Sequence, residues 1–371
     1  MTDKYYQKNI LVICPYPEGF AASQRLKYEQ YFEKWRNDGF NVTVSSFFSF
    51  ETWKILYEKG YFLSKVCGTI KGYFRRIRDL KRLKDFDCVY VCMWVTPLID
   101  TLFESLYTKR SKKLIFDFDD SIHMESDPNN RNFLKRILKN KKKIQLLIER
   151  SNDVITSSPY NLEYCKNNNI YNSATYIPCS LDALRFFPKK IKDDKKKLTL
   201  GWTGTFTSSS YLDSIREELK IACQKYNLKL LLITNFDYDI PDIDIEVIRW
   251  TKETEIIDLQ RIDIGLYPLI PSNWAKGKGG LKVLQYMSIG IPSISTNFGT
   301  ATHIIENGVT GYLVDDHQEW IEKIGLLVAD YEMRKNMGQL ARKKIMNTYS
   351  TEAVSPIYLN ILNGLKNDHR K

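Results

Sequence analysis

The sequence predicts an α/β fold made of two units, each built on a parallel sheet. A strand–helix–strand pattern opens the chain, and the same pattern restarts about halfway along its 371 residues. That length suggests two domains, at roughly 150 residues each. Hydrophobic residues make up 43% and charged residues 27% of the chain, which is a globular composition and excludes a disordered or collagen-like protein.

The first series of elements occupies residues 9–157. Residues 9–14 form a short apolar run before a proline, which is typical of a buried parallel strand. Aromatic and leucine residues recur at helical spacing over 23–38, and a second strand is expected at 41–45. Further strands are expected at 88–93, 114–118 and 153–157.

The second series begins with a strand at 198–202, a loop of Gly, Thr and Ser, and a helix over about 211–226. Later strands are expected at 228–234, 245–249, 262–267 and 293–296. Between the series, residues 191–197 are charged and have no apolar anchor, which is typical of a linker. We therefore expect a first domain over 1–188, a second over 189–350, and a terminal segment, 351–371.

Charge and cysteine content narrow the function classes. The net charge is +11, and residues 1–150 hold 28 Lys and Arg against 18 Asp and Glu, a balance of +10. Such asymmetry suggests an anionic partner for this half: nucleic acid, anionic lipid or a phosphorylated substrate. The seven cysteines include no Cys-x-x-Cys pair, which disfavours a disulfide framework or a zinc ribbon.

The lengths of the apolar runs indicate the cellular location of the chain. None approaches the roughly 20 residues that a membrane-spanning helix needs. The first residues contain no apolar signal core, so a cytoplasmic location is expected.

The richest loop for chemistry is 273–282, because ligands of open parallel sheets bind beyond the carboxyl ends of the strands. Its glycines precede an apolar helix, where backbone N–H groups and the helix dipole favour an anion. Lys276 and Lys278 add positive charge beside Gly279, Gly280 and Leu281. A diphosphate is the expected ligand. The alternative is a flexible surface loop with solvated lysines.

Several motifs then form a recognisable series. Residues 278–300 resemble the nucleotide-sugar half of GT-B glycosyltransferases of family 4. Residues 305–314, IENGVTGYLV, are similar to the I-x-x-G-x-x-G-x-L-V pattern of that family. Residues 176–188 are similar to its interdomain signature, and 201–205, GWTGT, resemble the first strand and loop of its C-terminal domain.

The resemblance implies a GT-B fold, with two Rossmann-like domains facing across a cleft. It implies a retaining glycosyltransferase of surface polysaccharide synthesis, with a nucleotide-diphosphate sugar in the second domain and a saccharide or lipid-linked acceptor in the first. No metal or other cofactor is required, because the lysines and the helix N-terminus would stabilise the departing diphosphate. Thr203, Gly204 and Thr205 are implied as donor contacts, and 351–371 as a helix that crosses back to the first domain.

The chain departs from the family pattern at the Glu-x7-Glu motif. The second Glu, which holds the donor ribose, aligns with Gln285, and the first aligns with Gly277. Gln285 can still hydrogen-bond ribose hydroxyls, without charge assistance. The usual Arg and Lys pair is not visible after Gly204, so Lys276 or Lys278 is expected to hold the diphosphate. The departures leave an alternative, a catalytically silent nucleotide-sugar or glycan-binding subunit.

Residues 116–123 end a strand of the first domain with three aspartates. Alternation along the strand places Asp117 and Asp119 on one side and Asp120 beyond its end. Asp119 and Asp120 are expected to orient the acceptor hydroxyl or take its proton. Two alternatives stay open: Asp120 or Ser121 caps the next segment, or Asp117 and Asp119 form the Asp-x-Asp metal motif of GT-A enzymes.

The first loop of the chain, 15–25, offers two further candidates. Gly19 would allow close approach of donor or acceptor. Arg25 is expected to bind an acceptor phosphate, with a solvated surface arginine as the alternative. His123, a lone histidine, is expected to be structural.

Residues 65–84 predict a basic amphipathic helix. An apolar row recurs every three or four residues: Val66, Ile70, Tyr73, Ile77 and Leu80. An opposing row is basic: Lys71, Arg75, Arg78 and Arg82. Such a helix suits an anionic membrane surface, which would make the protein peripheral on the inner membrane face. The basic stretch 135–143 favours the same interpretation.

Two other interpretations of this helix stay open. It could pack its apolar row inward and leave a solvated basic face. Nucleic acid is the less favoured partner, since no helix-turn-helix, RNP or zinc-finger signature occurs.

Overall fold

A computed structural model describes residues 7–98, 101–124, 141–188 and 197–367 of the chain. The chain divides into two compact units, of which the first combines residues 1–178 with 354–371 and the second spans 179–353. The expected linker at 191–197 lies, except for Lys197, outside the described residues. The first unit therefore ends ten residues before the expected boundary at 188, and it includes the end of the chain.

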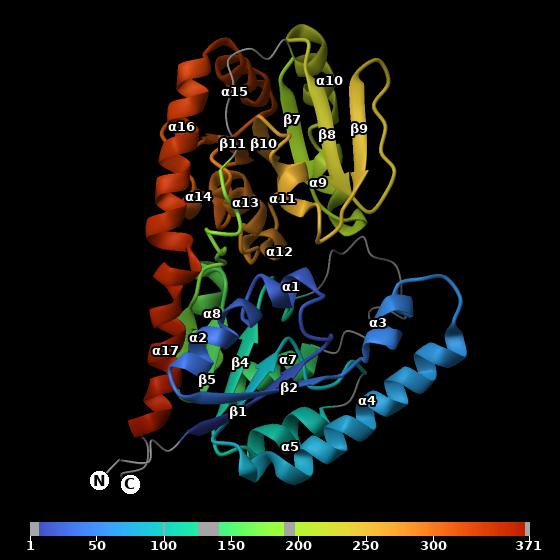
Figure 1. Cartoon of the computed structure of the whole chain (residues 1–371), viewed down its shortest axis with the longest axis vertical. Coiled ribbons are helices and arrows are strands. Elements are labelled where there is room, and N and C mark those ends of the chain that lie inside the picture. The colour runs from blue at the N-terminus through green and yellow to red at the C-terminus, as the bar shows by residue number, and fades with distance from the viewer. Residues whose placement is uncertain (1–6, 99–100, 125–140, 189–196, 368–371) are drawn as a thin grey trace. The chain divides into compact units, whose positions relative to one another are not determined.

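The first unit is built on a six-stranded parallel sheet with the order β2-β1-β3-β4-β5-β6 (Figure 1). The strands are β1 (Lys8–Cys14), β2 (Phe40–Ser46), β3 (Cys88–Cys92), β4 (Leu114–Phe118), β5 (Asp153–Thr156) and β6 (Ala174–Tyr176). Side chains alternate along β1, so that Ile10 and Val12 join one core cluster while Leu11 and Ile13 join another. Both faces of the sheet are therefore buried, as in an α/β sheet that helices cover on each side.

Helices from both ends of the chain cover the face that carries Ile10. Its core includes Trp35 of α2 (Phe32–Asn37) and Tyr358 of α17 (Thr351–Asn367). The expected helix at 23–38 is interrupted, and consists of α1 (Ala22–Arg25), η1 (Glu29–Tyr31) and α2. The interruption includes Lys27, whose side chain is buried.

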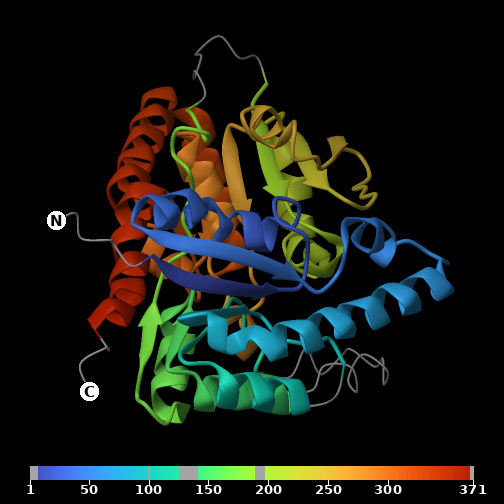
Figure 2. The same ribbon diagram turned by 60° about the horizontal axis from the view of Figure 1, so that its bottom comes forward.

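The opposite face of the first sheet is covered by helices from the middle of the chain (Figure 2). They are α4 (Phe62–Arg82) with its extension η2 (Leu83–Asp85), α5 (Leu102–Arg110), α7 (Lys141–Arg150) and α8 (Pro159–Asn168), and α3 (Phe50–Leu56) contacts α4. Over the described ranges, no helix is both long and apolar enough to cross a membrane.

The second unit contains another six-stranded parallel sheet, with the order β12-β11-β10-β7-β8-β9. The strands are β7 (Thr199–Thr203), β8 (Lys229–Thr234), β9 (Asp244–Arg249), β10 (Ile264–Tyr267), β11 (Ser293–Thr296) and β12 (Tyr312–Val314). In this order β8 and β9 lie on one side of β7, whereas β10, β11 and β12 lie on its other side. The strand order thus reverses between β7 and β10. Two parallel sheets confirm the predicted α/β class; the short strands β6 and β12 were not expected.

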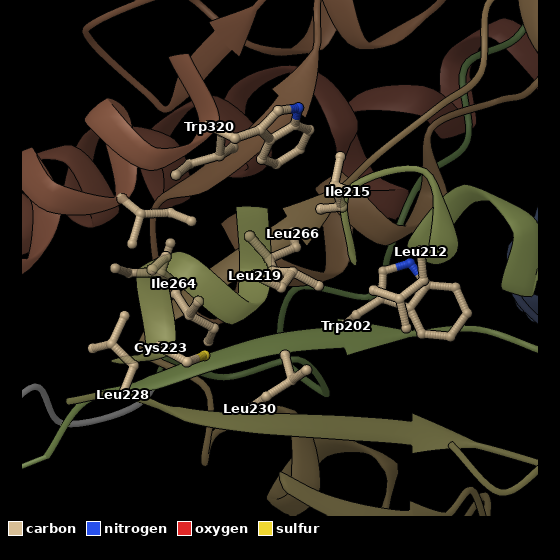
Figure 3. Close-up of a cluster of buried hydrophobic side chains, with 14 of the residues drawn as sticks. Trp202, Leu212, Ile215, Leu219, Cys223, Leu228, Leu230, Ile264, Leu266 and Trp320 are labelled. Atoms are coloured by element: carbon tan, nitrogen blue, oxygen red, sulfur yellow. The ribbon is translucent and has the colours of Figure 1, made fainter. Parts of the chain in front are cut away.

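One face of the second sheet packs against four helices around Trp202, Leu266 and Trp320 (Figure 3). These helices are α9 (Ser209–Asp213), α10 (Arg216–Lys225), α15 (His317–Ala329) and α16 (Tyr331–Lys344), so the expected helix at 211–226 is split in two. The remaining short elements are η3 (Phe206–Ser208), α11 (Glu255–Leu259), α12 (Asn273–Lys276), α14 (Ala301–Ile304) and η4 (Ile345–Tyr349).

Helix α13 (Leu281–Ser288) packs on β10 and β11. Tyr286 lies against Gly265, where an added Cβ would come within 2.4 Å of its ring. The Tyr286 hydroxyl accepts a hydrogen bond of 3.0 Å from the backbone N–H of Thr203, at the end of β7. These contacts hold α13 against β10 and beside the carboxyl end of β7.

Candidate functional site

The reversal of strand order between β7 and β10 marks the ligand-binding edge of the second sheet. Ligands of open α/β sheets bind at the carboxyl ends of the strands that flank such a reversal. The loop after β7 begins at Gly204, and the segment after β10 runs through α12 to the start of α13. Both segments contain residues that the sequence predicted as donor contacts.

Three lysines gather around this edge, and one of them was not predicted. Lys282 Nζ lies 4.4 Å from the ring centre of Trp202 and 3.4 Å from Ser208 Oγ. Lys278 Nζ lies 5.4 Å from the ring centre of Tyr211. Lys276 ends α12 and is partly buried. Lys282 reaches back from the first turn of α13 to the loop after β7.

Two glycines have physical reasons to be glycine. A Cβ on Gly204 would lie 2.2 Å from the Trp202 side chain and 2.7 Å from Lys282 Nζ. Gly280 immediately precedes α13 with a φ of +73°, a left-handed conformation that suits glycine. Together with Gly279 and Leu281, Gly280 brings backbone N–H groups to the first turn of α13.

The threonines of the loop after β7 differ in their surroundings. Thr203 is buried, and its hydroxyl donates to the backbone carbonyl of Ile233 at 3.2 Å while its N–H donates to Tyr286. Thr205 is exposed, and its hydroxyl lies 2.9 Å from that of Thr207. Of the predicted loop residues, Gly204 and Thr205 therefore present more of their surface than Thr203 does.

Gln285 lies one turn beyond Lys282 on α13 and belongs to a buried polar chain. Its Nε2 donates to Glu255 Oε1 at 3.2 Å, and Arg185 Nη2 lies 3.2 Å from the other carboxylate oxygen. Glu255 is 2% exposed and Gln285 is 7% exposed. Sequence reasoning missed Glu255, which belongs to no motif, and Arg185, which lies within the 176–188 signature, because both are far along the chain from residue 285.

The carboxyl edge of the first sheet carries a buried ion cluster. Lys27 Nζ lies 2.7 Å from Asp117 Oδ1 and 2.8 Å from Asp119 Oδ1. Tyr90 donates its hydroxyl to the other Asp117 oxygen. Burial alone would lower the pKa of Lys27, but the two carboxylates together raise it above its ordinary value. Asp119, a predicted catalytic residue, is therefore ion-paired, and its side chain is 28% exposed.

Two further residues, Asp120 and His123, follow Asp119 at the carboxyl edge of the first sheet. Asp120 has a φ of +47°, and its carbonyl accepts a hydrogen bond of 3.0 Å from Asn161 Nδ2. His123 stacks on Tyr164 with ring centres 4.1 Å apart, and burial lowers the pKa of His123 to about 4. Neither ring nitrogen of His123 has a hydrogen-bond partner among the described residues.

The loop after β1 is held by a hydrogen-bond network. Gly19, with a φ of +84°, donates its N–H to Glu29 Oε2 at 2.8 Å. Gln24 bonds both the N–H and the carbonyl of Tyr16 and donates to Glu29 Oε1. Arg25 is only 7% exposed, so the alternative of a solvated surface arginine is wrong.

The buried side of helix α4 differs from the side that the sequence predicted to be buried. Gly68, Gly72, Arg76 and Asp79 are its buried residues. The predicted apolar row is divided: Tyr73 packs between Phe47 and Phe103, while Ile70 is 50% exposed. The outward face carries further large apolar side chains, with exposures between 39% and 77%: Phe62, Leu63, Val66, Phe74 and Ile77. The expectation of an apolar row packed wholly inward is therefore wrong.

Arg76 explains how α4 can bury a polar face. Its guanidinium donates to the carbonyls of Cys14 at 2.9 Å, Ser45 at 3.1 Å and Val95 at 2.8 Å. These carbonyls belong to the ends of β1 and β2 and to the segment after β3. A fully buried arginine thus joins three neighbouring segments of the sheet to the helix, with Asp79 3.5 Å from its Nη1.

Several residues of the predicted basic row and basic stretch also bond or pack within the first unit, as Arg76 does. Arg75 donates to the carbonyl of Phe47 at 2.8 Å, and the Arg82 guanidinium lies over the ring of Phe86. Of the basic stretch 135–143, residues 135–140 lie outside the described part of the chain. Lys143 is buried, donates to the carbonyl of Leu98 at 2.9 Å and lies 3.8 Å from Glu104 Oε1. Lys71 and Arg78 remain exposed.

Comparison with known proteins finds a family match within the second unit. Residues 244–344, from β9 to the end of α16, match the family described as Glycosyl transferases group 1. The capsular polysaccharide biosynthesis glycosyltransferase CapM of Staphylococcus aureus is 24% identical over 193 residues. That alignment covers 49% of this chain and 50% of CapM, so it spans only half the length of the relative.

Solved structures resemble the chain over nearly its whole length. A glycosyltransferase from Rickettsia africae superposes with a TM-score of 0.68 and 13% identity, over 98% of this chain and 100% of that one. HepE from Anabaena, solved in complex with UDP and glucose, gives a TM-score of 0.63 and 12% identity, over 96% and 100% of the two chains. At these identities the likeness concerns the fold, which is the GT-B fold that the sequence motifs implied.

Proposed function

Because the chain carries a group 1 glycosyl transferase domain within a GT-B fold, we propose that it is a retaining glycosyltransferase that uses a nucleotide-diphosphate sugar. One observation carries the proposal above the others. Lys282, Lys278 and the first turn of α13 converge where the strand order of the second sheet reverses. Positive charge and the backbone N–H groups of a helix start at such a site suit a diphosphate.

We propose roles for the predicted residues on this basis. Gly204, Thr205 and the segment from Lys276 to Leu281 contact the diphosphate, and Gln285 contacts the ribose. Lys282 joins them, because its ammonium lies at the loop after β7. Asp119 and Asp120 act on the acceptor, and Arg25 contributes to binding it.

The proposed transfer makes one bond and breaks one. An acceptor hydroxyl oxygen bonds to the anomeric carbon as the bond from that carbon to the diphosphate breaks on the same face. The hydroxyl proton passes to an aspartate or to the departing diphosphate. The lysines stabilise the negative charge that the leaving nucleoside diphosphate gains. Because CapM is named for capsular polysaccharide biosynthesis, we propose a saccharide or lipid-linked acceptor in surface polysaccharide synthesis.

Turnover of a donor panel tests the proposal. The full chain is incubated with UDP-, GDP-, ADP- and CDP-linked sugars and a membrane extract as acceptor source, and release of nucleoside diphosphate is followed. We expect release from one donor class, stimulated by the extract. Tight donor binding without transfer or hydrolysis would favour the silent binding subunit instead.

We also propose that the outward face of α4 docks on an anionic membrane. Val66, Ile70 and Phe74 are spaced one turn apart and are exposed by 39%, 50% and 66%. Lys71 and Arg78 are exposed on the same helix. An apolar face of this size with basic neighbours suits the boundary between headgroups and acyl chains. The protein would then be peripheral on the inner membrane face.

Vesicle sedimentation tests this second proposal. The wild-type chain should sediment with vesicles that contain phosphatidylglycerol and less with pure phosphatidylcholine. Replacing Ile70 and Phe74 by serine should abolish sedimentation, and Lys71→Glu with Arg78→Glu should remove the lipid preference. The matched control replaces Ile221 and Leu340, exposed apolar residues of the second unit, by serine. Equal sedimentation of all variants would remove α4 from the membrane interface.

A further inference from the structure

Gln285 stands where the resembled family has a carboxylate, yet a carboxylate lies beside it. Glu255 comes from the first turn of α11, and its Oε1 lies 3.2 Å from Gln285 Nε2. Both side chains are more than nine-tenths buried. Arg185 lies 3.2 Å from the second oxygen of Glu255, which fixes the carboxylate from its other side.

The chemistry of this contact determines how the amide of Gln285 is oriented. An ionised carboxylate can only accept hydrogen bonds, so the Gln285 atom that faces it must be the NH2 group. The amide oxygen then points away from Glu255. Within the described part of the chain, no group donates a hydrogen bond to this oxygen. Gln285 also lies three residues after Lys282, which places the two side chains on one face of α13.

We infer that Glu255, held by Arg185, is a positioning residue that fixes the Gln285 amide with its oxygen toward the donor ribose. The inference rests on the proposed function, since it assigns how that donor is recognised. The oxygen accepts a hydrogen bond from a ribose hydroxyl, and the second N–H of the amide is available to donate one. The Glu255 and Gln285 pair thereby replaces a single carboxylate and selects ribonucleotides over deoxyribonucleotides.

The pair also predicts how its members depend on one another. Gln285→Glu alone would bring two buried carboxylates to hydrogen-bonding distance, which disfavours the charged form of both. Glu255→Gln alone would leave the orientation of the Gln285 amide undetermined, because an amide at 255 can either accept or donate. The exchange of both residues, Glu255→Gln with Gln285→Glu, restores one carboxylate and one amide in hydrogen-bonding contact.

Calorimetric titration of the full chain tests the inference. The probes are whichever of UDP, GDP, ADP and CDP binds the wild-type chain best, and the 2′-deoxy form of the same nucleotide. We expect the wild-type chain to prefer the ribonucleotide by about tenfold, the value of one well-placed hydrogen bond. Glu255→Gln should reduce that preference to about twofold, and Gln285→Glu should weaken ribonucleotide binding by about tenfold or more.

The double exchange and a control separate positioning from folding. The exchanged variant should recover the preference to within about threefold of the wild type, which a merely structural role for Glu255 would not produce. Glu246→Gln, on a partly exposed glutamate that pairs with Arg261, should leave the preference unchanged. Thermal unfolding of each variant identifies any that fail to fold, in which case the double exchange decides the matter.

Two outcomes contradict different parts of the account. If the wild-type chain binds none of the four nucleotides, both the proposed function and this inference are overturned. If it binds one of them and Glu255→Gln keeps the full preference for ribose, Glu255 does not position Gln285, and the proposed function stands.

Discussion

The carboxyl edges of the two sheets both hold basic side chains and use them differently. At the first edge, Arg76 and Lys27 are buried and bond to strand-end carbonyls and carboxylates of the first unit itself. At the second edge, Lys278 and Lys282 are partly exposed and lie over aromatic rings beside glycine loops. The same residue types therefore hold the fold together in one unit and are placed to meet a ligand in the other.

Because of this difference, the positive charge balance of residues 1–150 is weaker evidence for an anionic partner. The +10 over residues 1–150 suggested an anionic partner, but several of the charges act inside the first unit. Arg76, Lys27 and Lys143 are each at most 5% exposed. Among the described basic residues of this half, Lys71 and Arg78 on α4 stay exposed.

The largest effect that the comparison predicts is at Arg76. Replacing it by methionine keeps most of the volume but leaves three buried carbonyls without this donor and Asp79 without its cationic partner. We expect the free energy of unfolding to fall by about 3–5 kcal/mol, as for other broken buried ion pairs. Urea denaturation measures this. Arg78→Met, on the exposed side of the same helix, should change it by less than about 0.5 kcal/mol. If Arg76→Met lowers the free energy of unfolding as little as Arg78→Met does, the buried charge of Arg76 does not stabilise the fold.

The first edge should also make stability depend on pH through His123. Burial lowers the folded-state pKa of His123 to about 4, whereas an unfolded histidine has a pKa near 6.5. Between these values the unfolded state binds the proton and the native state does not, so stability is lost as pH falls from about 6.5 to 4. The loss approaches about 3 kcal/mol at the lower end.

His123→Phe isolates this contribution, because phenylalanine can keep the stacking on Tyr164. Urea denaturation at pH 7 and pH 4.5 should show a smaller acid loss in the variant than in the wild type, with similar stability at pH 7. An identical acid loss in both proteins would mean that His123 takes up its proton as readily in the folded state.

The second edge should respond in ligand affinity and not in stability. Lys282→Ala removes a charge that lies at the loop after β7, so the affinity for a nucleoside diphosphate should fall by about 2 kcal/mol, or roughly 30-fold. Thermal unfolding should stay near that of the wild type. Lys225→Ala on α10, whose ammonium lies over the Tyr226 ring, is the matched control and should leave affinity unchanged. A loss of stability without a loss of affinity would make Lys282 a structural lysine like Lys27.

The smallest effect is expected at the outward face of α4. Phe74 is 66% exposed, so Phe74→Ser should change the free energy of unfolding by less than about 0.5 kcal/mol. Phe32, which is 2% exposed on the core side of the first unit, is the contrast, and Phe32→Ala should cost about 3–5 kcal/mol. A cost at Phe74 comparable with that at Phe32 would mean that α4 packs by its apolar face after all.

Sequence reasoning succeeded where a periodic pattern determines the structure. Buried strands such as 114–118 were predicted to the residue, because apolar runs between turn residues admit few alternatives. The apolar helix after the glycines was also predicted, but the loop expected at 273–282 contains α12 and ends where α13 begins at Leu281. Short strands such as β6 were missed, since three residues carry too little periodicity to be recognised.

The side of a helix that faces the core was harder to predict than the helix itself. On α4 the apolar row suggested a buried face, but two glycines and the hydrogen bonds of Arg76 determine which side is buried. Partners such as Lys27 and Asp119, or Glu255 and Gln285, are brought together only by the fold. No local signal in the sequence announces such a pair.

The measurement that tests the central claim most directly compares one nucleoside with its diphosphate. The claim is that the lysine-bearing edge of the second sheet binds the diphosphate of a sugar nucleotide. Calorimetry of the full chain with uridine and UDP, and with the guanosine, adenosine and cytidine pairs, gives the affinity that the phosphates contribute. The account predicts that, for one of the four bases, the nucleoside diphosphate binds at least about 100-fold more tightly than the nucleoside, because the phosphates make two charge-assisted contacts. In Lys282→Ala this difference in affinity should be smaller by a factor of roughly 30. Equal affinity for nucleoside and diphosphate with every base would contradict it.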